Sequence, residues 1–269
     1  MRFVLTLVAG DPAAPLGEYT LRRMREAVVA TGARAGAPKW LDPGRACDLP
    51  FDSADPGAIT DAVRAALAES GLPIDAVAQP AQGRRKALLL ADMDSTIVTT
   101  ETLDELAGEV GLGDRVAAIT ARSMNGEMDF REALRERVAL LTGLPETTLS
   151  RTLARTTLTP GARILVRTMV ANGAYTALVS GGFRHFTAPI AARAGFDEDV
   201  ANVLEIRAGA LSGCLEEPIL DRDGKLATLK RLMSERDLTP ADVLAVGDGA
   251  NDLAMLEAAG LGIAFHARP

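Results

Sequence analysis

Three short, largely apolar runs dominate the hydrophobic pattern of residues 86–269, at residues 87–91, 175–179 and 243–246. A fourth follows at residues 261–265, and between the runs apolar residues recur at helical spacing. Runs of this length without polar alternation are typical of strands that are buried on both faces of a parallel sheet. The pattern therefore predicts an α/β fold with a Rossmann-like parallel sheet covered by helices.

Two further segments interrupt this alternation. Residues 100–157 read as helical throughout, and because they directly follow the first apolar run we expect a helical cap over the end of that strand. Residues 203–219, which are glycine-punctuated, predict a β-hairpin flap. Between them, Thr159 is expected to be an N-cap and Pro160 the first residue of a helix.

The first 80 residues follow a different pattern. Their order is strand, helix, two short strands, helix and strand, beginning with the apolar residues 3–9, and Asp55 is expected to cap the second helix. This is the ferredoxin-like α+β order. We therefore expect two domains, residues 1–80 and 86–269, joined by a linker at residues 81–85.

Composition narrows the class of protein. With 269 residues, 48% of them hydrophobic, the chain can bury a large core. A net charge of −7 and no basic stripe argue against nucleic-acid binding. No apolar run is long enough for a bilayer, and the first residues do not resemble a secretory leader, so we expect a cytoplasmic protein that does not contact membranes. Cys47 and Cys214 have no metal-type spacing, and we expect both to be buried or half-buried free thiols.

Candidate chemistry begins where the first apolar run ends. Asp92 and Asp94 stand one residue apart, and residues i and i+2 of an extended chain point to the same side. Two carboxylates in one crevice can divide the work, the first as a nucleophile and the second as a general acid and then a base. The alternative is an ordinary turn or helix cap built from aspartate and serine.

The second run ends in Ser180, Gly181 and Gly182, whose hydroxyl and accessible main-chain N–H groups suit a phosphate. Lys225 can neutralise the charge of a moving phosphoryl group. Taken singly, the glycine pair is only a turn, and the lysine can be a surface residue at the start of a helix.

The third run ends in Asp248, followed by Asn251 and Asp252. Together with Asp92 and Asp94 they form an oxygen-rich set without cysteine or histidine, which favours Mg²⁺. Asp248 and Asp252 can also be helix caps. The ends of these strands would have no catalytic role only if this alternative, and those given above for the other motifs, all held at once.

These motifs, at residues 92–96, 180–182, Lys225 and 247–252, resemble in order and spacing those of the haloacid dehalogenase superfamily of phosphatases. The resemblance covers roughly residues 86–269. In detail it implies a Mg²⁺-dependent enzyme that hydrolyses O-phospho-L-serine to serine and phosphate, the last step of serine biosynthesis.

The resemblance also implies a role for each motif residue. Asp92 would attack phosphorus to give an aspartyl-phosphate, while Asp94 protonates the leaving oxygen and later activates water. Mg²⁺ would be held by Asp92, the main-chain carbonyl of Asp94 and Asp248. The remaining motif positions would bind substrate or support the metal, namely Ser180, Gly181, Lys225 and Asn251 for the substrate and Asn251 and Asp252 for the metal.

Four positions in the helical insert match family residues that recognise the rest of the substrate. Glu101 matches the carboxylate that receives the ammonium group, Arg137 the guanidinium that receives the carboxylate, and Met124 and Phe130 the apolar residues that close over it. A bidentate arginine is a natural partner for a carboxylate. Considered alone, Glu101 is more simply a helix N-terminal acid and Arg137 a solvated helix residue.

Two other hypotheses remain open. One is a phosphatase or phosphotransferase for another small phosphomonoester, and the other is an amino-acid-responsive binding protein with a vestigial catalytic part. Residues 1–80 resemble amino-acid-sensing ACT domains in element order alone, and a role in homodimerisation is equally compatible with their pattern.

Overall fold

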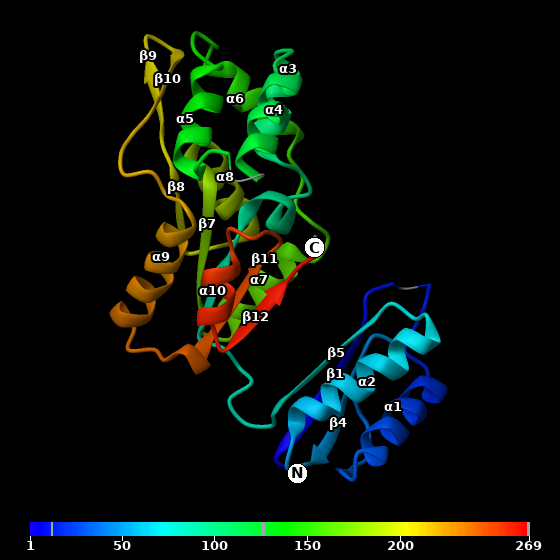
Figure 1. Cartoon of the computed structure of the whole chain (residues 1–269). Helices are drawn as coiled ribbons and strands as arrows, with labels where there is room; N and C mark the ends of the chain where they lie inside the picture. Colours follow the sequence, from blue (N-terminus) through cyan, green and yellow to red (C-terminus); the bar gives the residue numbers. More distant parts are fainter. Residues whose placement is uncertain (12, 125–126, 268–269) are drawn as a thin grey trace. The chain divides into compact units, whose positions relative to one another are not determined.

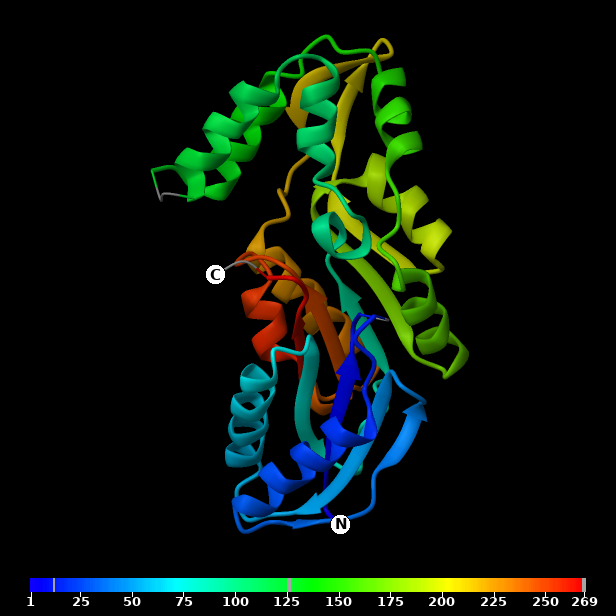
Figure 2. The ribbon, with the colours of Figure 1, turned by 90° about the vertical axis from the view of Figure 1, so that its right-hand side faces the viewer.

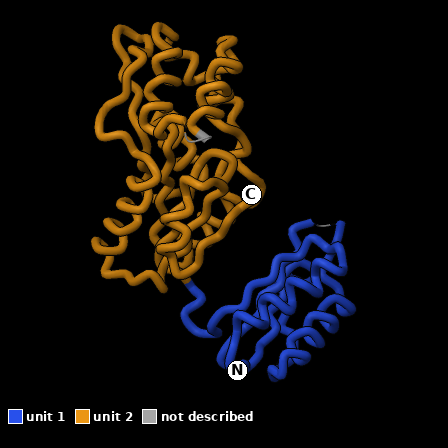
Figure 3. The backbone as a smooth tube through the Cα atoms, in the orientation of Figure 1, with its two compact units in different colours: residues 1–85 blue, residues 86–269 orange. Residues whose placement is uncertain are grey.

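The computed structural model describes residues 1–11, 13–124 and 127–267, without the side chain of Met124. The chain forms two compact units, Met1–Arg85 and Lys86–Pro269 (Figure 3). No helix in these described ranges has both the length and the apolar composition needed to cross a bilayer.

Unit 1, Met1–Arg85, is an antiparallel sheet with two helices. The sheet order is β2-β4-β1-β5, and β3 pairs with β4. The elements in chain order are β1 (Phe3–Ala9), α1 (Glu18–Ala30), β2 (Arg34–Ala35), β3 (Lys39–Asp42), β4 (Ala46–Asp52), α2 (Pro56–Ser70) and β5 (Ile74–Pro80). Asp55 caps α2 by accepting the Ala58 N–H at 3.1 Å. The apolar faces of β1, β4 and β5 pack on α1 and α2 in one core.

Unit 2 is built on a five-stranded sheet in the order β12-β11-β6-β7-β8, whose paired strands are all parallel. The strands are β6 (Leu88–Ala91), β7 (Tyr175–Phe183), β8 (Glu198–Asn202), β11 (Val243–Gly247) and β12 (Leu261–Ala264). The predicted α/β class and parallel sheet are confirmed. The edge strand β8 was not predicted, because the polar residues of Glu198–Asn202 give no apolar run.

Helices cover both faces of this sheet. Helices α7 (Ala162–Ala171) and α8 (Arg184–Ala194) pack on the face that carries Leu89 and Leu178. On the other face, α9 (Arg222–Glu235) and α10 (Leu253–Ala258) pack against Leu88 and Leu90, and the short turn η2 (Pro240–Asp242) leads into β11. Alternate residues of a buried strand point to opposite faces, so both faces of β6 are apolar.

The predicted helical insert follows the π-type turn η1 (Met93–Ile97) and forms a cap of four helices. They are α3 (Thr102–Glu109), α4 (Gly113–Met124), α5 (Phe130–Ala139) and α6 (Thr147–Arg155). The flap is the hairpin of β9 (Leu204–Arg207) and β10 (Ala210–Leu215), and β10 packs against α5. In Figures 1 and 2 the cap and the flap lie together beyond one end of the parallel sheet.

Two local predictions were wrong. Helix α7 begins at Ala162 with Gly161 as its N-cap, two residues later than predicted, because Pro160 and Gly161 form a turn whose second residue is not helical. Gly161 has φ +90°, a left-handed conformation that glycine adopts without strain. Cys214 is exposed on the flap, whereas Cys47 is buried as predicted.

Candidate active site

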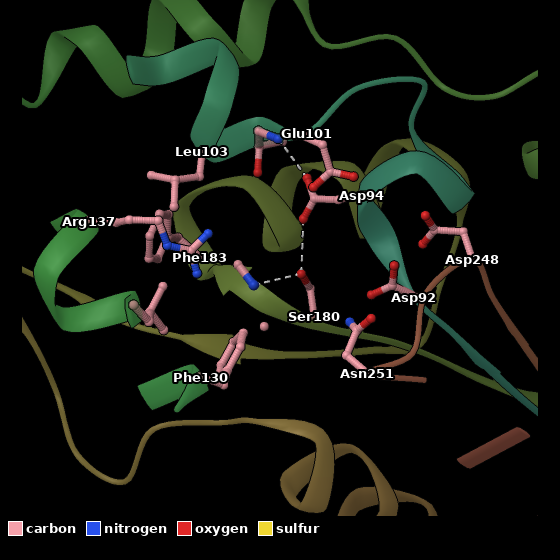
Figure 4. Close-up of a pocket in the computed structure, with 14 residues that line it drawn as sticks. Asp92, Asp94, Glu101, Leu103, Phe130, Arg137, Ser180, Phe183, Asp248 and Asn251 are labelled. Atoms are coloured by element: carbon pink, nitrogen blue, oxygen red, sulfur yellow. Dashed lines mark hydrogen bonds between the residues drawn. The ribbon is translucent and has the colours of Figure 1, made fainter. Parts of the chain in front are cut away.

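The ends of the three central strands of unit 2 meet at one edge of the sheet. The parallel registers pair Ala91 with Leu178 and with Val246, so the segments that follow β6 and β11 and the end of β7 lie side by side. They open into a cavity of about 160 Å³ between the sheet and the cap (Figure 4). The cavity is lined by Asp92, Asp94, Glu101, Thr102, Leu103, Phe130, Leu134, Arg137, Ser180, Gly181, Gly182, Phe183, Asp248 and Asn251.

A buried ion triad lies beneath the cavity. The Lys225 ammonium donates to Asp92 Oδ1 at 2.5 Å and to Asp252 Oδ1 at 2.6 Å, and all three side chains are at most 5% exposed. Burial alone would lower the pKa of Lys225, but the two carboxylates raise it above its ordinary value. Lys225 is therefore held as a cation against one oxygen of Asp92.

Asp94 lies where the cap joins the sheet. Its Oδ1 accepts the Thr102 N–H, at the first residue of α3, at 2.8 Å, and its Oδ2 accepts the Ser180 hydroxyl at 3.2 Å. Burial raises the pKa of Asp94, although both of these hydrogen bonds oppose the rise. A carboxyl group with a raised pKa is suited to carry a proton near neutral pH.

The end of β7 approaches Asp94 closely. The Gly182 N–H donates to Ser180 Oγ at 2.8 Å, which fixes the side chain of a residue that is 1% exposed. A methyl group on Gly182 would lie 3.1 Å from Asp94 Oδ2, and one on Gly181 would lie 3.0 Å from the ring of Phe130. A side chain at either position would therefore have to displace its neighbour by a few tenths of an ångström.

Sequence reasoning missed Asn202, a buried residue at the end of β8. Its amide group donates to the carbonyls of Gly181 at 2.8 Å and Leu220 at 3.1 Å, and its Oδ1 accepts the Leu220 N–H at 2.6 Å. Asn202 thus joins the glycine turn after Ser180 to the segment that leads into α9, which carries Lys225. No motif marks this residue, because its partners are distant in the sequence.

The cap contributes the opposite wall of the cavity. Ser95 donates to Glu101 Oε1 at 2.6 Å, and desolvation together with Asp94 raises the pKa of Glu101. Arg137 is half-buried and donates to the Ala133 carbonyl at 3.3 Å and to Thr120 Oγ1 at 3.4 Å, while burial lowers its pKa.

Three carboxylates on the sheet side form a cluster that can hold a cation. One oxygen each of Asp92, Asp248 and Asp252 lies within 4.8 Å of the others. Burial raises the pKa of Asp92 well above its usual range against the effect of Lys225, and burial with repulsion from Asp252 raises that of Asp248. A hard, oxygen-preferring divalent ion would relieve this repulsion, so the residues fit such an ion.

The structure brings almost all of the predicted site residues to one place. Those at the cavity wall are Asp92, Asp94, Glu101, Phe130, Arg137, Ser180, Gly181, Asp248 and Asn251. Lys225 and Asp252 lie below the wall and reach the site through Asp92. The side chain of Met124, at the end of α4, lies outside the described residues. Gly182, predicted with Gly181 as part of the phosphate-binding turn, also lies at the wall, and Thr102, Leu103, Leu134 and Phe183 complete it without having been predicted as site residues.

Comparison with known proteins agrees with this geometry. The family model for haloacid dehalogenase-like hydrolases matches residues 89–257. The phosphoserine phosphatase of Archaeoglobus fulgidus is 46% identical over 199 residues, which are 73% of this chain and 58% of that protein. That of Lactococcus lactis is 45% identical over 68% of this chain and 85% of its own length.

A solved structure with similarity over the whole chain is a HAD family hydrolase from Salmonella enterica serovar Typhi. Its TM-score is 0.84 at 28% identity, with coverage of 100% of this chain and 91% of that one. Among the curated relatives coverage is less complete, since the chain spans little more than half the length of the first two, 58% and 53%.

Proposed function

Because the chain belongs to the haloacid dehalogenase-like hydrolase family, we propose that it hydrolyses O-phospho-L-serine to L-serine and phosphate. The names of its curated relatives support this substrate. The observation that carries the proposal is the division of the cavity into two ends. Asp92, Asp94 and Ser180 lie on the sheet side, and Glu101 and Arg137 lie on the cap side (Figure 4).

This division matches the charges of phosphoserine. Its phosphate would lie at the Ser180 hydroxyl and the main-chain N–H of Gly181, above Lys225, with Asn251 beside it. Its ammonium group would pair with Glu101 and its carboxylate with Arg137. Phe130, and Met124 by analogy with the family, would cover the short carbon chain between them.

In the first step, the oxygen of Asp92 that is not bound to Lys225 would attack phosphorus. The bond from phosphorus to the serine oxygen breaks, and its electron pair leaves with that oxygen, which takes the proton of Asp94. The products are serine and an aspartyl-phosphate on Asp92. The raised pKa of Asp94 supports its role as the proton donor.

In the second step, the Asp94 carboxylate would take a proton from water as the water oxygen attacks phosphorus. The bond between phosphorus and Asp92 breaks, phosphate leaves, and Asp94 is protonated again, so atoms and charges balance over the cycle. Lys225 holds Asp92 in place through both steps and offsets the negative charge that collects at phosphorus.

We assign Mg²⁺ to the carboxylate cluster, held by Asp92, Asp248 and the main-chain carbonyl of Asp94. Asp252 and Asn251 would support this site, since Asp252 is already engaged by Lys225. When bound, the ion would neutralise negative charge between the carboxylates and the phosphate.

Phosphate release from phosphoserine, phosphoethanolamine and a sugar phosphate tests the proposal. We expect Mg²⁺-dependent release that is fastest with phosphoserine, and none from Asp92→Asn. Acid quenching during turnover should trap phosphate on the peptide that contains Asp92. If Arg137→Ala leaves the preference for phosphoserine over phosphoethanolamine unchanged, the assignment of Arg137 to the substrate carboxylate is wrong. If the unsubstituted protein releases phosphate faster from phosphoethanolamine or the sugar phosphate, another small phosphomonoester is the substrate.

For unit 1 we propose an ACT-like domain that binds an amino acid or joins two copies of the chain. The support is its order of strands and helices. Titration calorimetry with serine, on the full chain and on its Arg137→Ala variant, together with the mass in solution from light scattering, separates these two roles. Serine binding at unit 1 would survive the loss of the active-site arginine. We place the whole protein in cytoplasmic serine biosynthesis, as its last step.

A further inference from the structure

Two arginines on cap helix α5 form ion pairs outside the cap. Arg131 Nε donates to Asp221 Oδ2 at 2.7 Å, and one turn later an Arg135 terminal nitrogen donates to Glu217 Oε1 at 2.7 Å. Both acids belong to the segment that connects the flap to α9. Residues four apart lie on the same helix face, so the two arginines face this segment together.

The Arg131–Asp221 pair joins helix α5, which lines the cavity, to helix α9, which lies beneath it. Helix α5 begins at Phe130 and carries Arg137, while α9 carries Lys225. Asp221 is the N-cap of α9, because its Oδ1 accepts the Gly224 N–H at 3.0 Å. One carboxylate therefore both starts α9 and holds α5.

The two ion pairs differ in exposure. The Asp221 side chain is 15% exposed and its partner Arg131 52%, whereas Arg135 and Glu217 are 55% and 59% exposed. Exposed ion pairs contribute little, and partial burial reduces screening by solvent and salt. The Arg131–Asp221 pair should thus carry most of the effect, with Arg135–Glu217 in support.

We propose that Arg131 is a positioning residue for the reaction: its pair with Asp221 holds α5 so that Phe130 and Arg137 keep their places in the cavity wall, where they would contact the substrate. This rests on the proposed function. Arg131 itself does not line the cavity, so it acts through the placement of the helix. Its loss should weaken substrate binding more than it slows the chemical steps.

The test compares Arg131→Gln, Asp221→Asn and the double variant. Asparagine is as good an N-cap as aspartate, so Asp221→Asn removes the charge while keeping the start of α9. Arg151→Gln is the matched control, because Arg151 pairs with Glu109 inside the cap, at 2.9 Å. Arg131→Lys keeps the charge and should restore most of the effect.

We expect KM for phosphoserine to rise about fivefold in each single variant with kcat changed less than about twofold, and the double variant to be no worse than either single one. Raising the salt concentration to about 0.5 M should raise KM of the unsubstituted protein more than that of the variants, which have already lost the Arg131–Asp221 pair. Additive effects in the double variant, or an equal rise in Arg151→Gln, would overturn the proposal.

Hydrogen exchange of the amides at residues 130–139 gives a readout that does not depend on the substrate. Exchange should accelerate in Arg131→Gln and Asp221→Asn and stay unchanged in Arg151→Gln. If the unsubstituted protein releases no phosphate from phosphoserine, the proposed function fails, and hydrogen exchange alone then decides whether the Arg131–Asp221 pair holds α5. Unchanged exchange in both variants would refute this role of the pair.

Discussion

Replacing Lys225 with methionine tests whether the buried ion triad holds the site together. Methionine fills similar volume without charge, so a cavity contributes little. The change leaves Asp92 and Asp252 buried without the cation that lies 2.5 and 2.6 Å from them. Asp252 Oδ2 would keep only the Gly249 N–H at 3.2 Å among the contacts found in the described residues.

The expected cost follows from this burial. Removing one partner of a buried ion pair costs about 3–5 kcal/mol, because an uncompensated charge stays in the interior. For a unit of this size that is a fall in Tm of roughly 10 °C. Activity should fall at least about 100-fold, since in the proposed reaction Lys225 also offsets charge at phosphorus.

Urea unfolding followed by far-UV circular dichroism reports both units, and the loss in free energy of unfolding of unit 2 is the shift that appears in this signal alone. Trp40, the only tryptophan, lies in unit 1, so its fluorescence gives an internal control that should not change. Lys230→Met is the matched variant, the same substitution at an exposed position on α9. Adding Asp252→Asn to Lys225→Met should recover about half of the stability by removing one of the two orphaned charges. A loss below about 0.5 kcal/mol for Lys225→Met, or an equal loss for Lys230→Met, would refute the reasoning.

Three further results are expected. Mg²⁺ should raise Tm more at pH 8 than at pH 5. Burial raises the pKa of Asp92 and Asp248, so the stability of the metal-free fold falls as pH rises through these pKa values. The ion binds the ionised carboxylates, so its stabilising effect is larger at the higher pH. An equal rise in Tm at both pH values, measured by scanning fluorimetry, would contradict this prediction. Asn202→Leu should cost about 3 kcal/mol in urea unfolding and raise KM, because the Gly181 carbonyl loses its partner. Gly213→Ala should cost about 1–3 kcal/mol, since a methyl group would lie 2.0 Å from Thr142 Oγ1. Gly209→Ala, also at positive φ but with nothing within 4 Å, separates backbone strain from this clash.

The sheet and the chemistry at its edge could be predicted because their signals are local. Each central strand is a short apolar run, and each functional group follows within a few residues of the strand's end, as Asp92 follows Ala91. Parallel pairing then brings these ends together without further information. The signal for the N-cap at Asp55 is equally local, since the capping carboxylate and the Ala58 N–H that it accepts are three residues apart.

What escaped prediction depends on contacts between distant residues. Asn202 meets Gly181 and Leu220 across about twenty residues, and Arg131 meets Asp221 across ninety. The start of α7 was misplaced for a different reason. Gly161 takes a left-handed φ of +90° directly after the threonine–proline pair, whose local preference favours a helix start.

The contacts also distinguish changes near Asp92 from changes in the cap, which should affect different kinetic constants. Around Asp92 the partners are buried and belong to the sheet and α9, so a change there alters charge at the reacting phosphorus and should appear in kcat. Glu101 and Arg137 belong to the cap, whose position depends on partly exposed ion pairs, so changes there should appear in KM. Asp94 belongs to both parts, because it accepts one hydrogen bond from the cap and one from β7. A cap that moves away would remove the Thr102 N–H from Asp94, so the proposed proton donor would be fully oriented only with the cap in place over the substrate.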